Sequence, residues 1–303
     1  MSGTFRSVRN NRNAQLFFLG MLASNIGTWV QFTAVAIIVD RLTGKTTSIG
    51  ILSALQFGPM LVLGAWAGAV ADRVDRRKMT ILTQSALALQ ATALAVLDLT
   101  GTITIEWIYA LTFVLGVISA LDNPARRGFV TELVPEEQIT NAVSLNSALM
   151  TGSRIIGPAL GGLLVATVGF GWAFFFNGLT YLAVLAGLRM IDQTQVRPAP
   201  VTPRGKGQVR AGLAYAWSIT ELRVPLLMMT VIGTFAFNFQ TVLPLFAVRD
   251  LDGRDITFSL LMSVVSVGSL IGALRSARRT SVSVHTVSWR CGRPAAPASP
   301  CTR

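Results

Sequence analysis

The chain alternates between long apolar stretches and short charged ones. Residues 13–39 and 46–71 contain no Asp, Glu, Lys or Arg. A helix needs about 20 apolar residues to cross a bilayer, so each such stretch predicts a transmembrane helix. Eight are predicted in this way, at residues 13–39, 46–71, 79–97, 107–121, 143–168, 172–188, 224–248 and 256–274. The expected fold is an all-α integral membrane protein.

The segments between these helices divide the chain further. A tight turn, VGFG at residues 168–171, separates the fifth and sixth helices, and a segment rich in Pro, Gln and basic residues follows the sixth. We therefore expect an N-terminal segment (1–12), a six-helix lobe (13–190), a central linker (191–222), two helices of a second lobe (223–275) and a basic tail (276–303). Gly, Ala and Ser recur within the apolar stretches, as is typical of helices that pack closely in lipid.

Lysine and arginine are distributed unevenly between alternate connections. One set holds Arg6, Arg9, Arg12, Arg73, Arg76, Arg77, Lys78, Arg126, Arg127, Arg189, Arg197, Arg204, Lys206 and Arg210, whereas the other holds only Arg41, Lys45, Arg249 and Arg254. Cytoplasmic loops carry the excess of basic residues. This bias predicts a multi-pass protein of the plasma (inner) membrane with a cytoplasmic N-terminus.

Composition supports a membrane protein and excludes several other classes. Only 13% of residues are charged and 51% are hydrophobic, whereas soluble domains carry about 25% charged residues. A net charge of +12 is also typical of nucleic-acid-binding proteins. Apart from the tail, however, the basic residues lie mostly at the ends of apolar stretches, so we expect no nucleic-acid partner.

Residues for catalysis or metal binding are absent from the apolar body of the sequence. Its two cysteines, Cys291 and Cys301, and its one histidine, His285, lie near the C-terminal end. No GxxxxGK[ST] motif for nucleotide binding occurs. We therefore expect no enzyme activity, no cofactor and no metal site.

The chain also repeats itself at an offset of about 205 residues. IGTW at 26–29 recurs as IGTF at 232–235, DRLTG at 40–44 as RDLDG at 249–253, and GAWAGAV at 64–70 as GSLIGAL at 268–274. Two similar halves in the same orientation are typical of transporters built from parallel repeats. The first two predicted helices thus correspond to the seventh and eighth.

The second repeat breaks off after two of six helices. The sequence after residue 274 is basic and has no apolar stretch long enough to span a bilayer. One interpretation is a basic tail on a natural eight-helix protein, and another is a frameshift or truncation that replaced four helices. We favour the second, because a repeat that stops after two elements leaves most of the first half without a counterpart.

The charged segment, defined as residues 72–78, carries six charges in seven positions. A positive-inside anchor would explain its basic residues but not its two aspartates. With the preceding glycine it forms the pattern G-x-x-x-D-R-x-x-R-R-K at residues 68–78, which resembles the signature loop of the major facilitator superfamily. The residues that carry this resemblance are Gly68, Asp72, Arg73, Arg76 and Arg77.

The fifth predicted helix carries a second motif, GSRIIGPALGG at residues 152–162. It resembles the motif of the antiporter branch of that superfamily, through Gly152, Gly157, Pro158, Gly161 and Gly162. Proline removes a backbone donor and kinks a helix, and glycines allow another helix to approach the backbone. An ordinary packing helix with a proline kink is the alternative. Residues 123–162 also resemble the branch of enterobactin exporters and macrolide-efflux proteins.

The resemblance implies a twelve-helix fold of two six-helix lobes that rock around a central substrate site. It also implies that Asp72 caps or pairs at a helix end across the lobe interface. Arg73, Arg76 and Arg77 would complete a charge network that holds the outward-facing state. We call this inferred device the conformational latch. A carboxylate at a helix N-terminus is also favourable on physical grounds.

Four polar residues within or beside the predicted helices are candidates for substrate binding or coupling: Arg154, Asp122, Asn25 and Gln31. Intramembrane charges usually face the bundle interior or a water-filled path. Arg154 could instead extend toward the headgroups or pair with Asp122. Residues 107–121 carry neither a buried carboxylate nor a basic residue, which places proton antiport in doubt and leaves Asp122 as the nearest candidate for a coupling proton.

The sequence therefore predicts a secondary active transporter of the major facilitator superfamily in the lipid bilayer. We expect a small-molecule substrate, drug-like or siderophore-like, that the protein exports. The alternative is a truncated, non-transporting membrane protein, or a scaffold of packed helices.

Overall fold

We describe a computed structural model of the chain that covers residues 11–197 and 208–236, together with positions 261, 264 and 268. Six helices within these residues are long and apolar enough to cross a membrane. They are α2 (Arg12–Thr43), α3 (Thr46–Ala71), α4 (Arg76–Leu99), α5 (Ile105–Glu132), α6 (Ile139–Val168) and α7 (Phe170–Met190). They confirm the six predicted helices of the first lobe.

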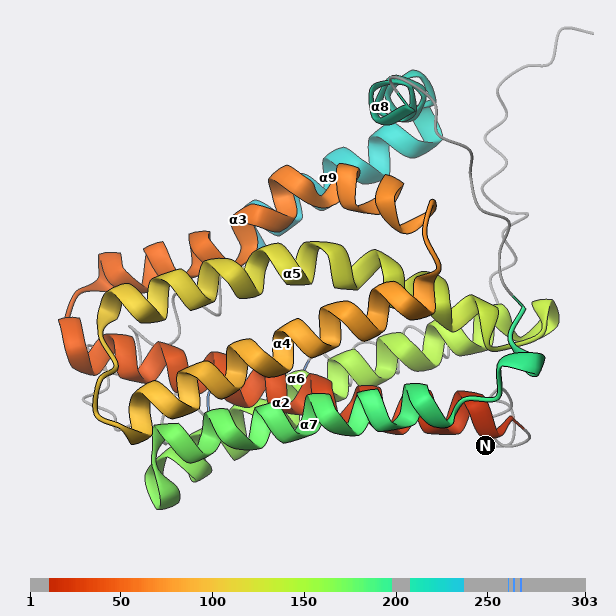
Figure 1. Cartoon of the computed structure of the whole chain (residues 1–303). Helices are drawn as coiled ribbons and strands as arrows, with labels where there is room; N and C mark the ends of the chain where they lie inside the picture. The colour runs from red at the N-terminus through yellow and green to blue at the C-terminus, as the bar shows by residue number, and fades with distance from the viewer. Residues whose placement is uncertain (1–10, 198–207, 237–260, 262–263, 265–267, 269–303) are drawn as a thin grey trace, which may run out of the picture.

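The six helices form one bundle in which neighbours in space are often distant in sequence (Figure 1). Helix α2 packs against both α6 and α7, α4 packs against α7 and α5, and α3 packs against α5. The start of α2, the connection between α3 and α4, and the end of α7 lie at the same end of the bundle. We call this end the charged end, because the charged segment lies there.

Helix α2 lies at the centre of the packing. In its most apolar 18-residue segment 67% of the residues are buried, against 22% in α3. Its N-terminus is capped by Asn11, whose Oδ1 accepts a hydrogen bond from the Ala14 amide at 3.1 Å, and its C-terminus ends at Gly44 in the left-handed conformation. A helix buried on nearly all sides must meet several neighbours at close range.

Glycines on α6 allow it to approach α2. A Cβ at Gly157 would collide with the Cβ of Trp29, and a Cβ at Gly161 would lie 3.1 Å from the Cβ of Thr33. Small residues of this kind allow helix backbones to approach closely where no hydrophobic force drives association in lipid. The second sequence motif therefore forms the contact between α6 and α2.

The opposite side of α2 meets α7 through glycines of its own. A Cβ at Gly20 would lie 3.1 Å from the Cα of Val184, and a Cβ at Gly27 would collide with the side chain of Asn177. Helix α2 is thus held between two neighbours, each at backbone contact. Such contacts fix the rotation of α2 and so decide which of its side chains face the interior.

A buried network of amides joins four of the helices. Gln31 of α2 donates to Gln90 Oε1 of α4 at 3.1 Å and accepts from Asn177 Nδ2 of α7 at 2.8 Å. Gln90 in turn donates to the carbonyl of Leu111 on α5 at 3.2 Å. Because buried polar groups are costly when unpaired, this amide network specifies how the helices pair.

The chain after α7 remains attached to the bundle. Asn13 donates to the Asp192 carbonyl at 2.9 Å and accepts from the Asp192 amide at 3.0 Å. A short 3-10 turn, η2 (Gln193–Gln195), follows, and the Arg197 amide donates to the Glu132 carbonyl at 3.0 Å. The first residues of the predicted linker therefore pack on the first lobe.

Helix α5 is longer than the sequence pattern predicted. The expected helix covered residues 107–121 and could run at most a little past Asp122, but α5 continues through Arg126 and Arg127 to Glu132. The two arginines that were assigned to a connection therefore lie in a helix. The charges do not end the helix, because Asp122 and Arg126 stand four residues apart and pair with each other.

Two further helices follow within the described residues, α8 (Gln208–Ser218) and α9 (Thr220–Ala236). Helix α8 occupies part of the predicted linker 191–222, and α9 begins before the predicted helix 224–248, whose remainder lies outside the described residues. The eighth predicted helix and the tail 276–303 also fall outside them, apart from Leu261, Val264 and Gly268, which are helical.

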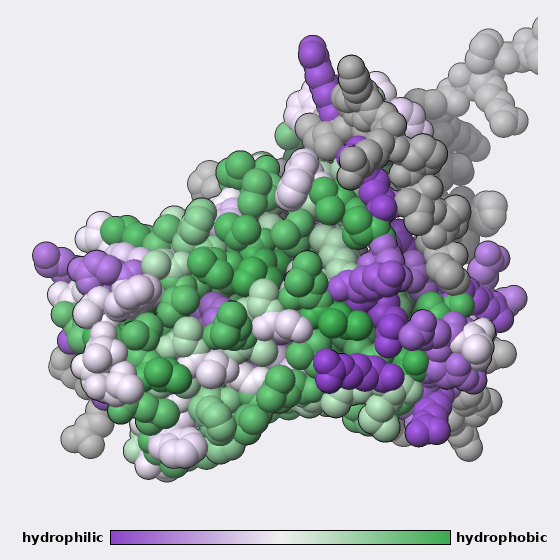
Figure 2. Space-filling model, viewed as in Figure 1, coloured by the Kyte–Doolittle hydropathy of each residue, from purple (hydrophilic) through white to green (hydrophobic). Residues whose placement is uncertain are grey.

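The surface matches a lipid environment. Figure 2 shows an apolar band over the middle of the bundle and hydrophilic residues gathered toward its ends, most densely at the charged end. Large apolar side chains such as Leu61 (89% exposed) and Leu89 (73% exposed) lie on the outside. Exposed apolar surface over most of a bundle is expected where lipid rather than water covers it.

The contact between α6 and α2 yields a first prediction. The variant Gly157→Ala should lower the free energy of unfolding by about 1–3 kcal/mol, because the added methyl group forces α6 away from Trp29. Gly152→Ala is the matched control on the same helix, since its Cβ meets no atom within 4 Å and alanine favours helix by about 1 kcal/mol. Thermal unfolding in detergent measures both, and equal stability of the two variants would contradict this packing.

Candidate functional site

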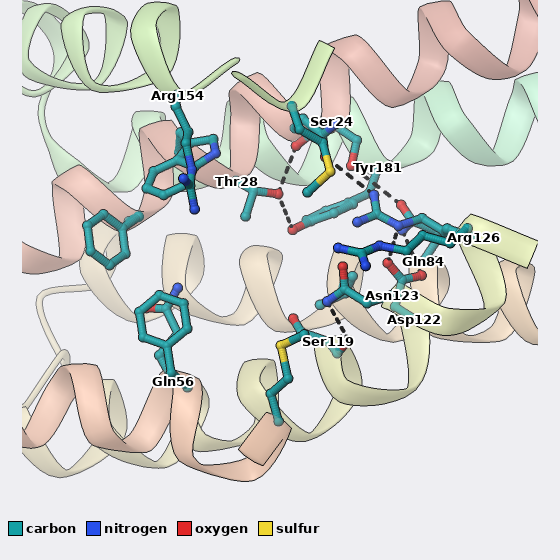
Figure 3. Close-up of a pocket in the computed structure, with 18 residues that line it drawn as sticks. Ser24, Thr28, Gln56, Gln84, Ser119, Asp122, Asn123, Arg126, Arg154 and Tyr181 are labelled. Carbon is teal, nitrogen blue, oxygen red and sulfur yellow. Dashed lines mark hydrogen bonds and ion pairs between the residues drawn. The ribbon is translucent and has the colours of Figure 1, made fainter. Parts of the chain in front are cut away.

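A cavity of about 260 Å³ lies inside the bundle, and all six long helices contribute to its lining (Figure 3). Its described lining combines aromatic, amide, hydroxyl and charged groups: Ser24, Asn25, Thr28, Trp29, Phe32, Gln56, Phe57, Met60, Gln84, Leu87, Ser119, Asp122, Asn123, Arg126, Arg127, Met150, Arg154 and Tyr181. Apolar walls with a few convergent polar groups are typical of small-molecule sites.

An ion pair lies at one side of the cavity. Arg126 Nε is 2.7 Å from Asp122 Oδ2, although its N–H bond does not point along this line. The other carboxylate oxygen, Oδ1, accepts hydrogen bonds from the Thr83 hydroxyl at 2.6 Å and from Gln84 Nε2 at 3.0 Å. Asp122 is buried, and its negative charge is compensated by Arg126 on α5 and by hydrogen-bond donors on α4.

Asn25 connects this ion pair to α2. Its Oδ1 accepts a hydrogen bond from Arg126 Nη1 at 3.4 Å, and its side chain is buried. Its Nδ2 has no hydrogen-bond partner among the described residues. The orientation of the amide follows from its neighbour, because the reverse orientation would direct two N–H groups at a guanidinium, which only donates.

Arg154 extends from α6 into the cavity (Figure 3). Its guanidinium lies over the ring of Trp29, 5.1 Å from the centroid, and that ring packs edge-on against Phe32. A guanidinium in this position is attracted by the ring quadrupole. The expected alternative of a pair between Arg154 and Asp122 is wrong, because Arg126 of α5 is the partner of Asp122.

Among the lining residues that the sequence analysis did not single out as candidates are Arg126, Arg127 and Tyr181. The first two were assigned to a connection, although the spacing of Asp122 and Arg126 is that of an i,i+4 ion pair. Tyr181 is buried in α7, and its hydroxyl lies 3.0 Å from the Thr28 hydroxyl at the cavity wall. A single aromatic residue in an apolar helix gives no signal of its own.

Gln31 does not line the cavity, so the structure does not support its assignment as a substrate residue. Both ends of its amide are used by Gln90 and Asn177 in the amide network. Asn25, Asp122 and Arg154, by contrast, are brought together in the lining. The sequence could not separate these cases, because all four are polar positions in or next to apolar stretches.

The charged segment differs in detail from the expectation. Asp75 caps the N-terminus of α4, where its Oδ1 accepts from the Lys78 amide at 3.0 Å. Asp72 instead follows the last residue of α3, so it stands at a helix C-terminus. The argument that Asp72 is favoured at a helix N-terminus therefore applies to Asp75.

Two arginines of the charged segment, Arg76 and Arg77, bind within the first lobe. Arg76 pairs with Asp72 at 3.1 Å and with Glu132 at the end of α5 at 3.2 Å. Arg77 donates to the carbonyl of Leu188, near the end of α7, with its shorter contact at 2.7 Å. These contacts join the start of α4 to the ends of two other helices.

The remaining motif residues lie on α3, in its connection to α4, and on α6. Gly68 stands in the last turn of α3, and a Cβ there would meet no atom within 4 Å, whereas Arg73 is half-buried in the connection. On α6, Pro158 and Gly162 are buried beside the two glycines that contact α2, and Gly152 is half-buried. Among the described residues, no group of three His, Cys, Asp or Glu could hold a metal ion.

A bundle of six helices that all line one cavity matches one lobe of the major facilitator fold, and solved structures agree. A bacterial homologue of the human lysosomal transporter Spinster superposes with a TM-score of 0.62 at 14% identity, covering 91% of this chain and 65% of that one. The family model described as transmembrane secretion effector, a major facilitator family, matches residues 2–287. This chain belongs to that family.

Curated relatives in this superfamily are transporters of named small molecules. The staphyloferrin A transporter of Staphylococcus aureus is 26% identical and matches 85% of this chain. Macrolide efflux protein A of Streptococcus pyogenes is 23% identical over 84% of it, and the enterobactin exporter EntS of Salmonella choleraesuis is 23% identical over 86%. The predicted resemblance to this branch is confirmed. The matches span 65%, 64% and 62% of these relatives' own lengths.

The buried ion pair yields a second prediction. Asp122→Asn leaves the Arg126 charge uncompensated, so the free energy of unfolding should fall by about 3–5 kcal/mol. The double variant Asp122→Asn with Arg126→Gln should recover part of this loss. Arg127→Gln, an exposed neighbour on the same helix, should change stability by about 0.5 kcal/mol or less. Thermal unfolding in detergent tests all three, and additive losses in the double variant would refute the coupling.

Proposed function

We propose that this chain acts as a secondary active exporter of drug-like or siderophore-like small molecules. The observation that carries the proposal is the cavity, because residues from all six helices of a major facilitator lobe converge on it. The functions of the relatives, staphyloferrin A transport, macrolide efflux and enterobactin export, support this substrate range. Binding would alternate between the two sides of the membrane as lobes rock around the cavity.

The proposed orientation places the charged end in the cytoplasm. The start of α2, the charged segment and the end of α7 share this end, and the excess of arginine and lysine in its connections supports a cytoplasmic position in the plasma membrane. Cleavage of the connection between α3 and α4 by protease added to intact spheroplasts would contradict this orientation.

We infer that Gly68, Asp72, Arg73, Arg76 and Arg77 serve as the conformational latch. Arg76 holds Asp72 and Glu132 together, and Asp72 is 58% exposed at its side chain and therefore accessible to a further partner. The space beside Gly68 supports the same role, because a helix of the second lobe could approach the end of α3 there. The latch would favour one of the two transport states.

A proton is the proposed coupling ion, with Asp122 as its binding site. Asp122 is the one carboxylate in the described lining of the cavity. Its protonation would remove the charge that compensates Arg126 and so change the electrostatics of the cavity. Proton binding and the binding of a charged substrate would then influence each other.

The transport proposal has a direct test. Proteoliposomes that contain the full chain should take up a radiolabelled macrolide or iron-free siderophore along an inward-directed substrate gradient. A proton gradient across the same membrane should increase this uptake, and a protonophore should abolish the increase. Asp122→Asn protein that unfolding curves show to be folded should retain downhill exchange but lose the response to the proton gradient. If the wild-type chain moves neither compound, the alternative of a non-transporting membrane protein holds.

The latch has a matched pair of variants. Asp72→Asn should lower the transport rate at least about tenfold with little change in stability, because an exposed ion pair contributes only about 0–1 kcal/mol. Asp75→Asn should transport normally, since asparagine caps a helix about as well as aspartate. Equal rates for Asp72→Asn and the wild type would exclude the latch, and unfolding curves show whether each variant is intact.

A further inference from the structure

One glycine near the end of α5 leaves room for a charged side chain of another helix. A Cβ at Gly128 would lie 2.5 Å from Nε, 2.6 Å from Cδ and 2.8 Å from Cζ of Arg76, the first residue of α4. Carbon atoms in ordinary contact are about 3.5–4.0 Å apart, so no residue with a Cβ fits here while Arg76 keeps its position. We call this space on α5 the Gly128 notch.

The Arg76 guanidinium makes several contacts from the Gly128 notch. Its Nη1 lies 3.2 Å from Glu132 Oε1 and 3.5 Å from the Gly128 carbonyl oxygen, and its Nη2 lies 3.1 Å from Asp72 Oδ1. A guanidinium carries its donors in a fixed planar fork, so one group placed here reaches two carboxylates at once. These contacts join the start of α4 to the ends of α3 and α5.

The two carboxylates differ in how firmly they can hold Arg76. The Glu132 side chain is buried, with 8% exposed, whereas that of Asp72 is 58% exposed. Glu132 is also the last residue of α5, and a cation is favoured beside a helix C-terminus but disfavoured at a helix N-terminus, where Arg76 itself stands. The contact with α5 therefore fixes Arg76, and Asp72 is the partner that can be exchanged.

We propose that Gly128 is a positioning residue of the conformational latch: the Gly128 notch holds the Arg76 guanidinium where it binds Glu132 and Asp72 together. The inference rests on the proposed function, because it assigns the residue that sets the geometry of the latch. Gly128 lies outside the described lining of the cavity, so its role is to place Arg76 and not to bind the substrate. Alanine at this position would push the flexible end of Arg76 out of the notch and away from its carboxylates.

Transport by the full chain in proteoliposomes tests this role. Gly128→Ala should lower the transport rate about tenfold, as is expected of Asp72→Asn, and the double variant should be slower than either single variant by about twofold at most, because residues that act through one contact have non-additive effects. Gly50→Ala is the matched control, since its Cβ meets no atom within 4 Å, and should transport normally. Losses that multiply in the double variant, or a wild-type rate for Gly128→Ala, overturn the inference.

Unfolding in detergent tests the contact itself and does not depend on transport. Arg76→Ala removes the three side-chain atoms that a methyl group at position 128 would meet. Gly128→Ala should therefore change Tm less favourably in the wild-type chain than in the Arg76→Ala background, by about 2 °C or more. In that background it should raise Tm or leave it unchanged, because alanine favours a helix over glycine. The same change of Tm in both backgrounds would also overturn the inference.

The two measurements separate this inference from the proposed function. If the wild-type chain moves no compound but Gly128→Ala acts differently in the two backgrounds, the exporter proposal fails and the placement of Arg76 by Gly128 stands. If the chain exports its substrate and Gly128→Ala exports it equally fast, the exporter proposal stands and the inference fails, because the Gly128 notch is then a packing contact only.

Discussion

The contact between α2 and α6 is the constraint from which the cavity follows. Gly157 has no side chain, and the space that one would occupy is filled by Trp29. Trp29 in turn supports the guanidinium of Arg154, which comes from the same helix as Gly157. A glycine that at first concerned only packing therefore also determines where a charge stands in the cavity. In lipid, where no hydrophobic force draws helices together, such close contacts decide the arrangement of the bundle.

Polar groups within the bundle fall into two classes that differ in how completely they are paired. The amide network of Gln31, Gln90 and Asn177 holds the helices together, and both ends of the Gln31 amide are used. Around the cavity, the Asp122 carboxylate is compensated, but Asn25 Nδ2 has no hydrogen-bond partner within the part of the chain that the structure describes. The first class stabilises the fold, and the second borders the cavity.

The sequence predicted the six helices well because the bilayer imposes a length and an apolar composition on each. The helix 46–71 was predicted with the bounds that α3 has, and the turn at Gly169 was placed correctly. The end of α5 was missed, since a rule that stops helices at charges fails where Asp122 and Arg126 neutralise each other inside the bundle. Such pairings, like the choice between Asp72 and Asp75 as a cap, depend on backbone geometry that composition does not encode.

Candidate residues were harder to predict than helices. The rotation of each helix about its own axis decides which of its side chains face the cavity. Gln31 and Asn25 are both amides in the same apolar stretch, six positions apart, yet one joins the amide network and the other borders the cavity. Without knowledge of which neighbours surround α2, no periodicity could separate them. Arg154 was singled out as an unusual charge within an apolar stretch, and its contact with the Trp29 ring could not be predicted from the sequence.

The attachment of the chain after α7 sets the length of the segment that connects the first lobe to α8. Asn13 holds Asp192, and the Glu132 carbonyl holds the Arg197 amide, so the chain leaves the first lobe at residue 197 rather than at the end of α7. Ten residues, 198–207, then separate it from α8. Even fully extended they reach about 35 Å. Helix α8 therefore cannot begin farther than this from residue 197, which lies at the same charged end as Arg76 and Arg77.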